Sequence, residues 1–180
     1  MTNQKKAVFL DRDGVINKEV SYLSDPKNFK FIKGSIDALK ILKRKGFLLI
    51  IITNQAGIAR GIFTEKILEV IHNKMLKTLK HNDVQIDNIY YCPHHPDFTG
   101  PCNCRKPHPG MILEAQLNFN IDLNNSYMVG DTLNDIETGK AANCKTVLVL
   151  TGYGKKEKKK ISSIIPDMIF KNLKEFAINI

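Results

Sequence analysis

Two observations predict that this sequence forms an α/β protein, built as a parallel sheet with helices on both faces. Short apolar runs, of which residues 47–52 are the most apolar, alternate along the chain with segments whose apolar residues recur at helical spacing. Polar side chains also follow three of these runs, beginning at Asp11, Thr53 and Asp131. Because the carboxyl ends of parallel strands meet at one edge of a sheet, we expect one shared ligand site there.

The predicted strands are apolar runs bounded by polar or turn residues, as expected of strands buried on both faces of a sheet. They comprise residues 7–10, 47–52, 86–91, 127–129 and 146–150, with a short addition at 169–170. The predicted helices carry an apolar stripe, and Thr64 and Gly46 are residue types preferred at a helix start and just past a helix end. They comprise residues 35–45, 64–81, 109–117, 133–142 and 173–180. Residues 18–33, 92–104 and the lysine-rich run 155–160 are predicted to be loops.

Length and composition indicate one globular domain over residues 1–180, with 43% hydrophobic and 25% charged residues. No apolar run approaches the roughly 20 residues that a membrane-spanning helix needs, and no signal peptide is recognised, so a cytoplasmic location is expected. The net charge of +9 could attract a phosphorylated metabolite or a nucleic acid. No aromatic residues interleave the lysine run, which argues against nucleic acid, and we expect a monomer.

An acidic motif, Asp11-Arg12-Asp13-Gly14, directly follows the first strand. Two carboxylates this close repel each other unless a shared proton or a cation stabilises them. Mg²⁺, held by carboxylates and phosphate oxygens, is a natural partner for such a pair. The alternative is an acidic turn in which Asp11 caps a helix. The buried strand that leads into the motif favours the metal site, and Gly14 permits the sharp turn after it.

Three further groups suit a phosphoryl ligand at the same edge of the sheet. They are the hydroxyl of Thr53, the cations of Arg105-Lys106 and a third carboxylate at Asp131. The chain has no Gly-x-x-x-x-Gly-Lys-Ser/Thr phosphate loop, so nucleotide-driven chemistry is not indicated. A carboxylate can itself attack phosphorus and form an aspartyl-phosphate.

A second motif holds three of the four cysteines. Cys92-x-His94 and Cys102-x-Cys104 offer four ligands in two close pairs, which suits a closed tetrahedral structural Zn²⁺ site. The alternative is a set of free thiols without a metal. Since Arg105-Lys106 follows the second pair directly, a zinc-bound loop would fix where these two cations point.

The motifs, in their order along the chain, resemble those of the haloacid dehalogenase superfamily of phosphatases. The matching strings are Asp11-x-Asp13-Gly14, Thr53-Asn54, Lys106-Pro107 and Gly130-Asp131-x-x-x-Asp135. Longer strings at residues 9–17, 53–61, 90–96 and 104–111 are similar to the family within it that acts on heptose bisphosphates and on histidinol phosphate. The resemblance spans about residues 7 to 150 and implies a Rossmann-like core. Nothing the size of a large cap domain fits between the first two motifs.

The resemblance implies a Mg²⁺-dependent phosphatase that removes the 7-phosphate of a heptose 1,7-bisphosphate through an aspartyl-phosphate. Asp11 would be the nucleophile, and Asp13 would be the general acid and base. The implied Mg²⁺ ligands are Asp11, the backbone carbonyl of Asp13, and Asp131. Thr53 and Lys106 would hold phosphoryl oxygens. The implied substrate contacts are Glu19, Tyr22, Asn54, Gln55 and Arg105.

One position departs from the family pattern and leaves alternatives open. Heptose phosphatases carry Lys after the fourth-motif aspartate, where this chain has Thr132. The alternatives are a histidinol-phosphate phosphatase, a polynucleotide 3′-phosphatase and a zinc-stabilised nucleic-acid-binding module without catalysis. The three acidic residues argue against the module, since a pure binder of phosphate needs no carboxylates in its site. Asp135 is expected either to support the site or to be an ordinary helix residue.

Overall fold

The computed structural model describes residues 4–180, and its centre is a six-stranded parallel sheet in the order β3-β2-β1-β4-β5-β6. The strands are β1 (Ala7–Leu10), β2 (Leu48–Asn54), β3 (Asn88–Cys92), β4 (Tyr127–Gly130), β5 (Lys145–Val149) and β6 (Met168–Phe170). From β1 the chain builds outwards through β2 and β3, then returns to place β4 on the other side of β1. This reversal of strand order opens a crevice beyond the carboxyl ends of β1 and β4, where α/β proteins bind ligands.

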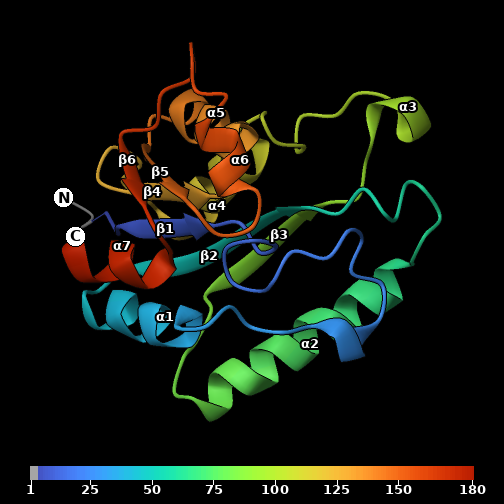
Figure 1. Ribbon diagram of the computed structural model, residues 1–180, viewed down its shortest axis with the longest axis horizontal. Helices are drawn as coiled ribbons and strands as arrows, with labels where there is room; N and C mark the ends of the chain where they lie inside the picture. Colours follow the sequence, from blue (N-terminus) through green and yellow to red (C-terminus); the bar gives the residue numbers. More distant parts are fainter. Residues whose placement is uncertain (1–3) are drawn as a thin grey trace.

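Helices cover both faces of the sheet (Figure 1). They are α1 (Ser35–Arg44), α2 (Glu65–His81), α3 (Pro96–Thr99), α4 (Gly110–Phe119), α5 (Leu133–Ala141), α6 (Gly154–Lys158) and α7 (Leu173–Asn179), with a short 3₁₀ turn, η1 (Pro26–Asn28). Figure 1 shows α1, α2 and α7 on one face and α4, α5 and α6 on the other. The predicted α/β class, with a parallel sheet and two helical layers, is confirmed.

The central strand β1 is buried on both faces, as its uninterrupted apolar sequence predicts. Val8 and Leu10 pack into the core beneath α1, α2 and α7. Ala7 and Phe9 point the opposite way, into the core formed with α4. The two cores clamp this strand from both sides, so the residues that follow it are held at a fixed place in the crevice.

Some segments predicted to be loops contain short helices. The prediction of a loop was wrong for part of the lysine-rich run, because α6 occupies Gly154–Lys158. The carboxylate of Glu157 in this helix accepts a hydrogen bond from the backbone N–H of Leu133 at 3.2 Å, which ties α6 to the start of α5. The predicted loop at residues 92–104, called the cysteine loop below, likewise contains a short helix, α3.

No separate cap domain covers the crevice within residues 4–180. Between β1 and α1, the segment 11–34 contains the turn η1 and isolated β-bridges but no longer helix or strand. Its loop runs over the carboxyl edge of the sheet and supplies part of the crevice wall. Across the same described part of the chain, no helix is long and apolar enough to span a membrane.

Candidate active site

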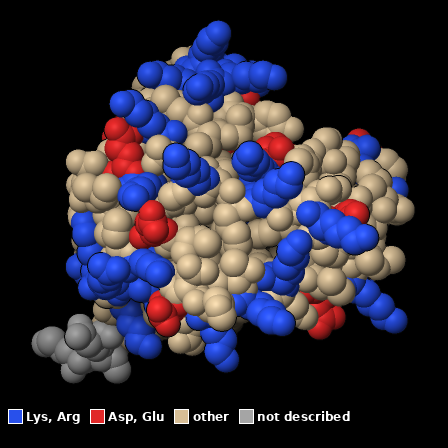
Figure 2. All heavy atoms as spheres, turned by 60° about the horizontal axis from the view of Figure 1, so that its bottom comes forward, with Lys and Arg blue, Asp and Glu red and all other residues tan. Residues whose placement is uncertain are grey.

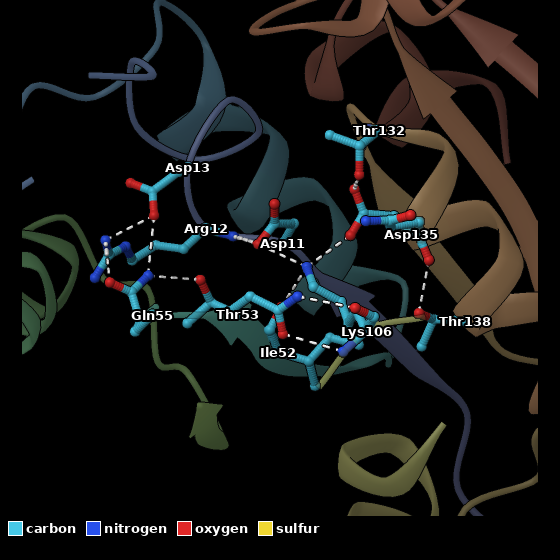
Figure 3. A network of polar contacts seen from close by, with 12 residues as sticks. Asp11, Arg12, Asp13, Ile52, Thr53, Gln55, Lys106, Thr132, Asp135 and Thr138 are labelled. Atoms are coloured by element: carbon cyan, nitrogen blue, oxygen red, sulfur yellow. Dashed lines mark hydrogen bonds and ion pairs between the residues drawn. The ribbon is translucent and has the colours of Figure 1, made fainter. Parts of the chain in front are cut away.

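Lys106 is the central cation of the crevice. Its Nζ atom lies 2.9 Å from Oδ1 of Asp11 and 2.6 Å from Oδ1 of Asp135. It also donates a hydrogen bond to the carbonyl of Ile52 at 3.1 Å (Figure 3). The lysine is 3% exposed, and the two carboxylates keep it charged by raising its pKa above the ordinary value although burial opposes this.

Three buried carboxylates, those of Asp11, Asp131 and Asp135, have oxygens within 4.8 Å of one another. Burial, together with the charges of Asp11 and Asp135, raises the pKa of Asp131 to about 9. Burial also raises the pKa of Asp11 to about 6, although Lys106 opposes the shift. One lysine cannot balance three ionised carboxylates, so without a metal Asp131 holds a proton at neutral pH, and a divalent cation would take the place of that proton.

The backbone around Asp131 leaves room for little besides its carboxylate and a small ligand. Oδ2 of Asp131 accepts a hydrogen bond from the backbone N–H of Tyr153 at 2.7 Å. A Cβ atom on Gly14, whose φ is +81°, would lie 2.1 Å from that oxygen, and one on Gly152 would lie 2.0 Å away. These residues therefore fit a Mg²⁺ ion held by Asp131 and Asp11, since hard oxygen ligands converge in a cradle that larger side chains would fill.

Asp13, the second carboxylate of the motif, is held by a separate set of donors. Oδ2 accepts from Arg12 at 2.7 Å and from Nε2 of Gln55 at 3.1 Å, and Oδ1 accepts from Nδ2 of Asn17 at 2.8 Å. Burial alone would raise its pKa, but the Arg12 charge and these hydrogen bonds outweigh burial and hold the pKa below the ordinary value of an aspartate. Asp13 is therefore ionised in the free protein at neutral pH.

Residues at the end of β2 contact both Asp13 and the segment that carries Lys106. The hydroxyl of Thr53, which is 1% exposed, accepts a hydrogen bond from Nε2 of Gln55 at 2.8 Å. The side-chain amide of Asn54 bonds the backbone of Lys106 in both directions, at 3.1 Å each. Gln55 thus joins Thr53 to Asp13 (Figure 3), and Asn54 fixes the segment that presents Lys106.

Asp135 both supports Lys106 and starts a helix. It is fully buried, and its Oδ2 accepts from the backbone N–H of Thr132 at 3.0 Å and from the Thr132 hydroxyl at 2.6 Å. The uncharged Thr132, which stands where the family pattern has Lys, is therefore engaged at the first turn of α5. Of the two expectations for Asp135, support of the site is the one its contacts favour.

The crevice holds a cavity of about 310 Å³ that opens to the surface. The five predicted substrate residues all line it: Glu19, Tyr22, Asn54, Gln55 and Arg105. Burial and the charges of Asp13 and Asp11 raise the pKa of Glu19 to about 7. Its carboxyl group is therefore partly protonated near neutral pH and adds less negative charge to a phosphate site than an ordinary glutamate.

The cysteine loop forms one end of the site and brings three sulfurs together. The Sγ–Sγ distances are 3.0 Å between Cys92 and Cys104, 3.5 Å between Cys102 and Cys104, and 3.6 Å between Cys92 and Cys102. Two sulfurs bound at about 2.3 Å on a tetrahedral zinc are roughly 3.8 Å apart, so this trio could hold the ion. The ring of His94 lies outside this group. Its carbonyl accepts from Nη1 of Arg105 at 3.1 Å.

Sequence reasoning missed several residues that complete the site. Arg12 and Asn17 hold Asp13, and the backbone of Tyr153 holds Asp131. His72 in α2 contacts Arg12, with its Nε2 atom 3.1 Å from Nη1. Arg12 could have been noticed because it stands between the two motif aspartates. His72 gave no signal beyond its position on the apolar stripe of its helix.

Curated heptose phosphatases are similar to this chain over most of its length. D-glycero-beta-D-manno-heptose-1,7-bisphosphate 7-phosphatase of Escherichia coli (strain K12) is 51% identical over 158 residues, covering 84% of this chain and 83% of that protein. The protein of the same name from Pasteurella multocida (strain Pm70) is 46% identical over 182 residues, covering 94% and 99% respectively. A family model for HAD-hydrolase-like proteins matches residues 103–176.

Solved structures agree with these relatives. The crystal structure of D,D-heptose 1,7-bisphosphate phosphatase from B. bronchiseptica, complexed with magnesium and phosphate, matches with a TM-score of 0.90 at 34% identity and covers 96% of each chain. The D,D-heptose 1,7-bisphosphate phosphatase from Burkholderia thailandensis matches with a TM-score of 0.75 at 31% identity and covers 97% of each chain. The chain therefore belongs to the D-glycero-D-manno-heptose-1,7-bisphosphate 7-phosphatase family of the haloacid dehalogenase superfamily.

Proposed function

We propose that this chain removes the 7-phosphate of D-glycero-D-manno-heptose 1,7-bisphosphate through a phosphorylated Asp11. The observation that carries the proposal is the buried cluster in which Lys106 lies 2.9 Å from Asp11, with Asp131 beside them. This arrangement offers a nucleophile, a cation for the phosphoryl group and hard ligands for a metal in one cavity. The curated relatives carry this activity in their names.

In the first step, a carboxylate oxygen of Asp11 attacks phosphorus, and the bond from phosphorus to the sugar oxygen breaks in line. Asp13 donates a proton to the sugar oxygen, which keeps the electron pair of the broken bond. Lys106 and Thr53 bind the phosphoryl oxygens, whose negative charge is spread in the transition state. The phosphoryl charge beside Asp13 raises its pKa by like-charge repulsion and so favours the protonated form that this step needs.

In the second step, Asp13 accepts a proton from a water molecule that attacks the phosphorus of the aspartyl-phosphate. The bond from phosphorus to Asp11 breaks, and inorganic phosphate and the free carboxylate are regenerated. Asp11, Asp131 and the backbone carbonyl of Asp13 would hold Mg²⁺. When bound, the ion neutralises charge on the phosphoryl oxygens and between the carboxylates.

A zinc ion on the cysteine loop has a structural role in this proposal. Cys92, Cys102 and Cys104 supply three ligands, and His94 remains the predicted fourth. Four protein ligands leave no open position for a catalytic water. The loop leads directly into Arg105 and Lys106, so its order determines where Lys106 enters the crevice.

We expect Cys102→Ser to release zinc from the purified protein, to lower the melting temperature and to reduce turnover. Zinc content should fall from about one ion per chain to near zero, since one ligand of a structural site is lost. Activity should fall by about a hundredfold, because a shift of about 1 Å in a positioning group has a cost of that order. The dependence on Mg²⁺ should persist.

Cys144→Ser is the matched control, because Cys144 is buried and lies outside the three-sulfur group. It should keep its zinc. Elemental analysis of reduced protein and thermal melting measure both variants. Protein that carries no zinc when reduced, or a Cys102→Ser variant with unchanged kinetics and melting, would contradict the structural role.

The charge distribution on one face of the molecule and the size of the cavity favour a small substrate over a polynucleotide. Figure 2 shows Lys and Arg side chains spread over the face in view, with acidic side chains among them, rather than gathered in one stripe. A protein that tracks a phosphate backbone gathers its cations along one groove. The 310 Å³ cavity also suits a sugar bisphosphate. A monomeric state and a cytoplasmic location remain predictions.

A substrate panel tests the proposed function. The protein with Mg²⁺ should hydrolyse heptose 1,7-bisphosphate with a kcat/KM at least about a hundredfold above that for histidinol phosphate or DNA 3′-phosphate, because the sugar hydroxyls and the second phosphate offer the polar cavity more groups to bind in the transition state. Release of inorganic phosphate measures all three. A preference for histidinol phosphate or for the DNA end would replace the proposed substrate. Salt-sensitive DNA binding without turnover would indicate the non-catalytic module.

A further inference from the structure

A buried chain of side chains connects the motif carboxylate Asp13 to helix α2. Arg12 is fully buried, and its Nη2 atom donates to Oδ2 of Asp13 at 2.7 Å and to Oε1 of Gln55 at 3.3 Å. On the other side of the guanidinium, Nη1 lies 3.1 Å from Nε2 of His72. Figure 3 shows the inner part of this chain, from Arg12 through Gln55 to Thr53.

The His72 contact defines the state of its imidazole. A guanidinium has only donors, so Nε2 of His72 must be the acceptor and the ring must carry its proton on Nδ1. Burial and the charge of Arg12 lower the pKa of His72 to about 3, which is consistent with a neutral ring. His72 is 8% exposed, on the buried face of α2 beside Leu68 and Ile71.

Arg12 depends on this contact for its orientation. Its Nε atom has no hydrogen-bond partner among residues 4–180, and His72 is the acceptor that the structure gives to Nη1. Without His72, the guanidinium would be held only through Nη2. A buried cation that loses one of its partners shifts or recruits water, because an unpaired buried donor is costly.

We propose that His72 is a positioning residue for Asp13 and acts through Arg12. His72 does not line the active-site cavity, so it does not act by touching the substrate. It fixes the Arg12 guanidinium, and Arg12 with Gln55 fixes the carboxylate oxygen of Asp13. The proposal rests on the proposed function, in which Asp13 protonates the departing sugar oxygen.

Two substrates separate this role from a general effect on the fold. Departure of a sugar alkoxide needs the proton from Asp13, whereas p-nitrophenolate is a far better leaving group and departs without one. The quantity kcat/KM includes substrate binding and the departure of the leaving group, but not the later hydrolysis of the aspartyl-phosphate. It therefore reports on the step in which Asp13 donates its proton to the leaving group. The ratio of kcat/KM for heptose 1,7-bisphosphate to kcat/KM for p-nitrophenyl phosphate also cancels any loss of folded protein.

The variants are His72→Asn and His72→Gln. The Asn side chain is too short to place an acceptor where Nε2 stands, whereas the Gln oxygen reaches about that point. We expect His72→Asn to lower the ratio about tenfold, a part of the 10² to 10⁴ that general acid catalysis contributes, and His72→Gln to restore it within about threefold. The inhibition constant of the product, heptose 1-phosphate, should stay the same.

The control is His81→Gln, which changes an exposed histidine at the end of the same helix and should leave the ratio unchanged. An unchanged ratio in His72→Asn, a failure of His72→Gln to restore it, or a parallel change in product inhibition would each overturn the positioning role. If the wild-type protein does not hydrolyse the heptose bisphosphate, the proposed function fails instead. The ratio is then measured with an alkyl phosphate that it does hydrolyse.

Discussion

Asp11→Asn should reduce hydrolysis of heptose 1,7-bisphosphate by at least about 10⁴-fold, to the background rate, because an amide cannot attack phosphorus as a carboxylate does. The substitution keeps the shape of a side chain that is 14% exposed and packed against Lys106. It also removes a negative charge that burial and the neighbouring carboxylates disfavour, so the fold should tolerate it. Release of inorganic phosphate under saturating Mg²⁺ measures the effect.

Asp83→Asn is the matched control for this substitution. Asp83 is exposed and has φ of +56°, a conformation that asparagine adopts as readily as aspartate. This variant should have wild-type activity. Both variants should melt within about 4 °C of the wild type, the shift that roughly 1 kcal/mol produces in a domain of this size. Turnover by a folded Asp11→Asn protein at more than a few per cent of the wild-type rate would exclude Asp11 as the nucleophile.

Removal of divalent metal should abolish turnover, and Mg²⁺ alone should restore it. The buried carboxylates of Asp11, Asp131 and Asp135 face one lysine, so without a cation their mutual repulsion also opposes the approach of a phosphate dianion. Loss of the ion should therefore reduce the rate by at least about 10³-fold, in line with several kcal/mol of charge stabilisation from a metal. Activity is measured after EDTA treatment and again after Mg²⁺ is added in excess.

The chelation experiment needs a control for the cysteine loop, because EDTA could also remove zinc. Zinc content and melting temperature are measured on the same treated sample, and both should be unchanged when Mg²⁺ restores the rate. Asp131→Asn should raise the Mg²⁺ concentration required for half-maximal activity at least about tenfold, since one carboxylate ligand becomes neutral. Full activity after exhaustive chelation would rule out the role given to Asp131.

The order of strands and helices was predictable because each core element carries a strong local pattern. Residues 48–52 of β2 are all apolar, and α1 and α2 have helical stripes that end or begin at favoured residues. The helical start of the lysine run was not predictable from composition. The first residue of this helix, Gly154, packs closely against the end of β5, and Glu157 accepts a hydrogen bond from the start of α5. Tertiary contacts therefore decide the structure of this segment.

The site was predictable where its residues stand at the ends of strands. The sequence predicts Asp11, Thr53 and Asp131 at one edge of the sheet. In the structure all three line the same cavity as Lys106, which contacts Asp11. What pattern reasoning could not supply is the set of supporting contacts. The buried ion pair of Arg12 with Asp13 and its link to His72 depend on how α2 packs against the sheet, which no local pattern encodes.

The most direct measurement of the central claim is to trap phosphate on Asp11. In Asp13→Asn, the aspartyl-phosphate should form from p-nitrophenyl phosphate, whose leaving group needs no proton, but should hydrolyse slowly because no base activates water. We predict a burst of about one p-nitrophenolate per active site. After an acid quench, mass spectrometry should find one phosphoryl group on the peptide that contains Asp11. Steady release of p-nitrophenolate without a burst or phosphorylated protein, or a phosphoryl group on another residue, would contradict the account.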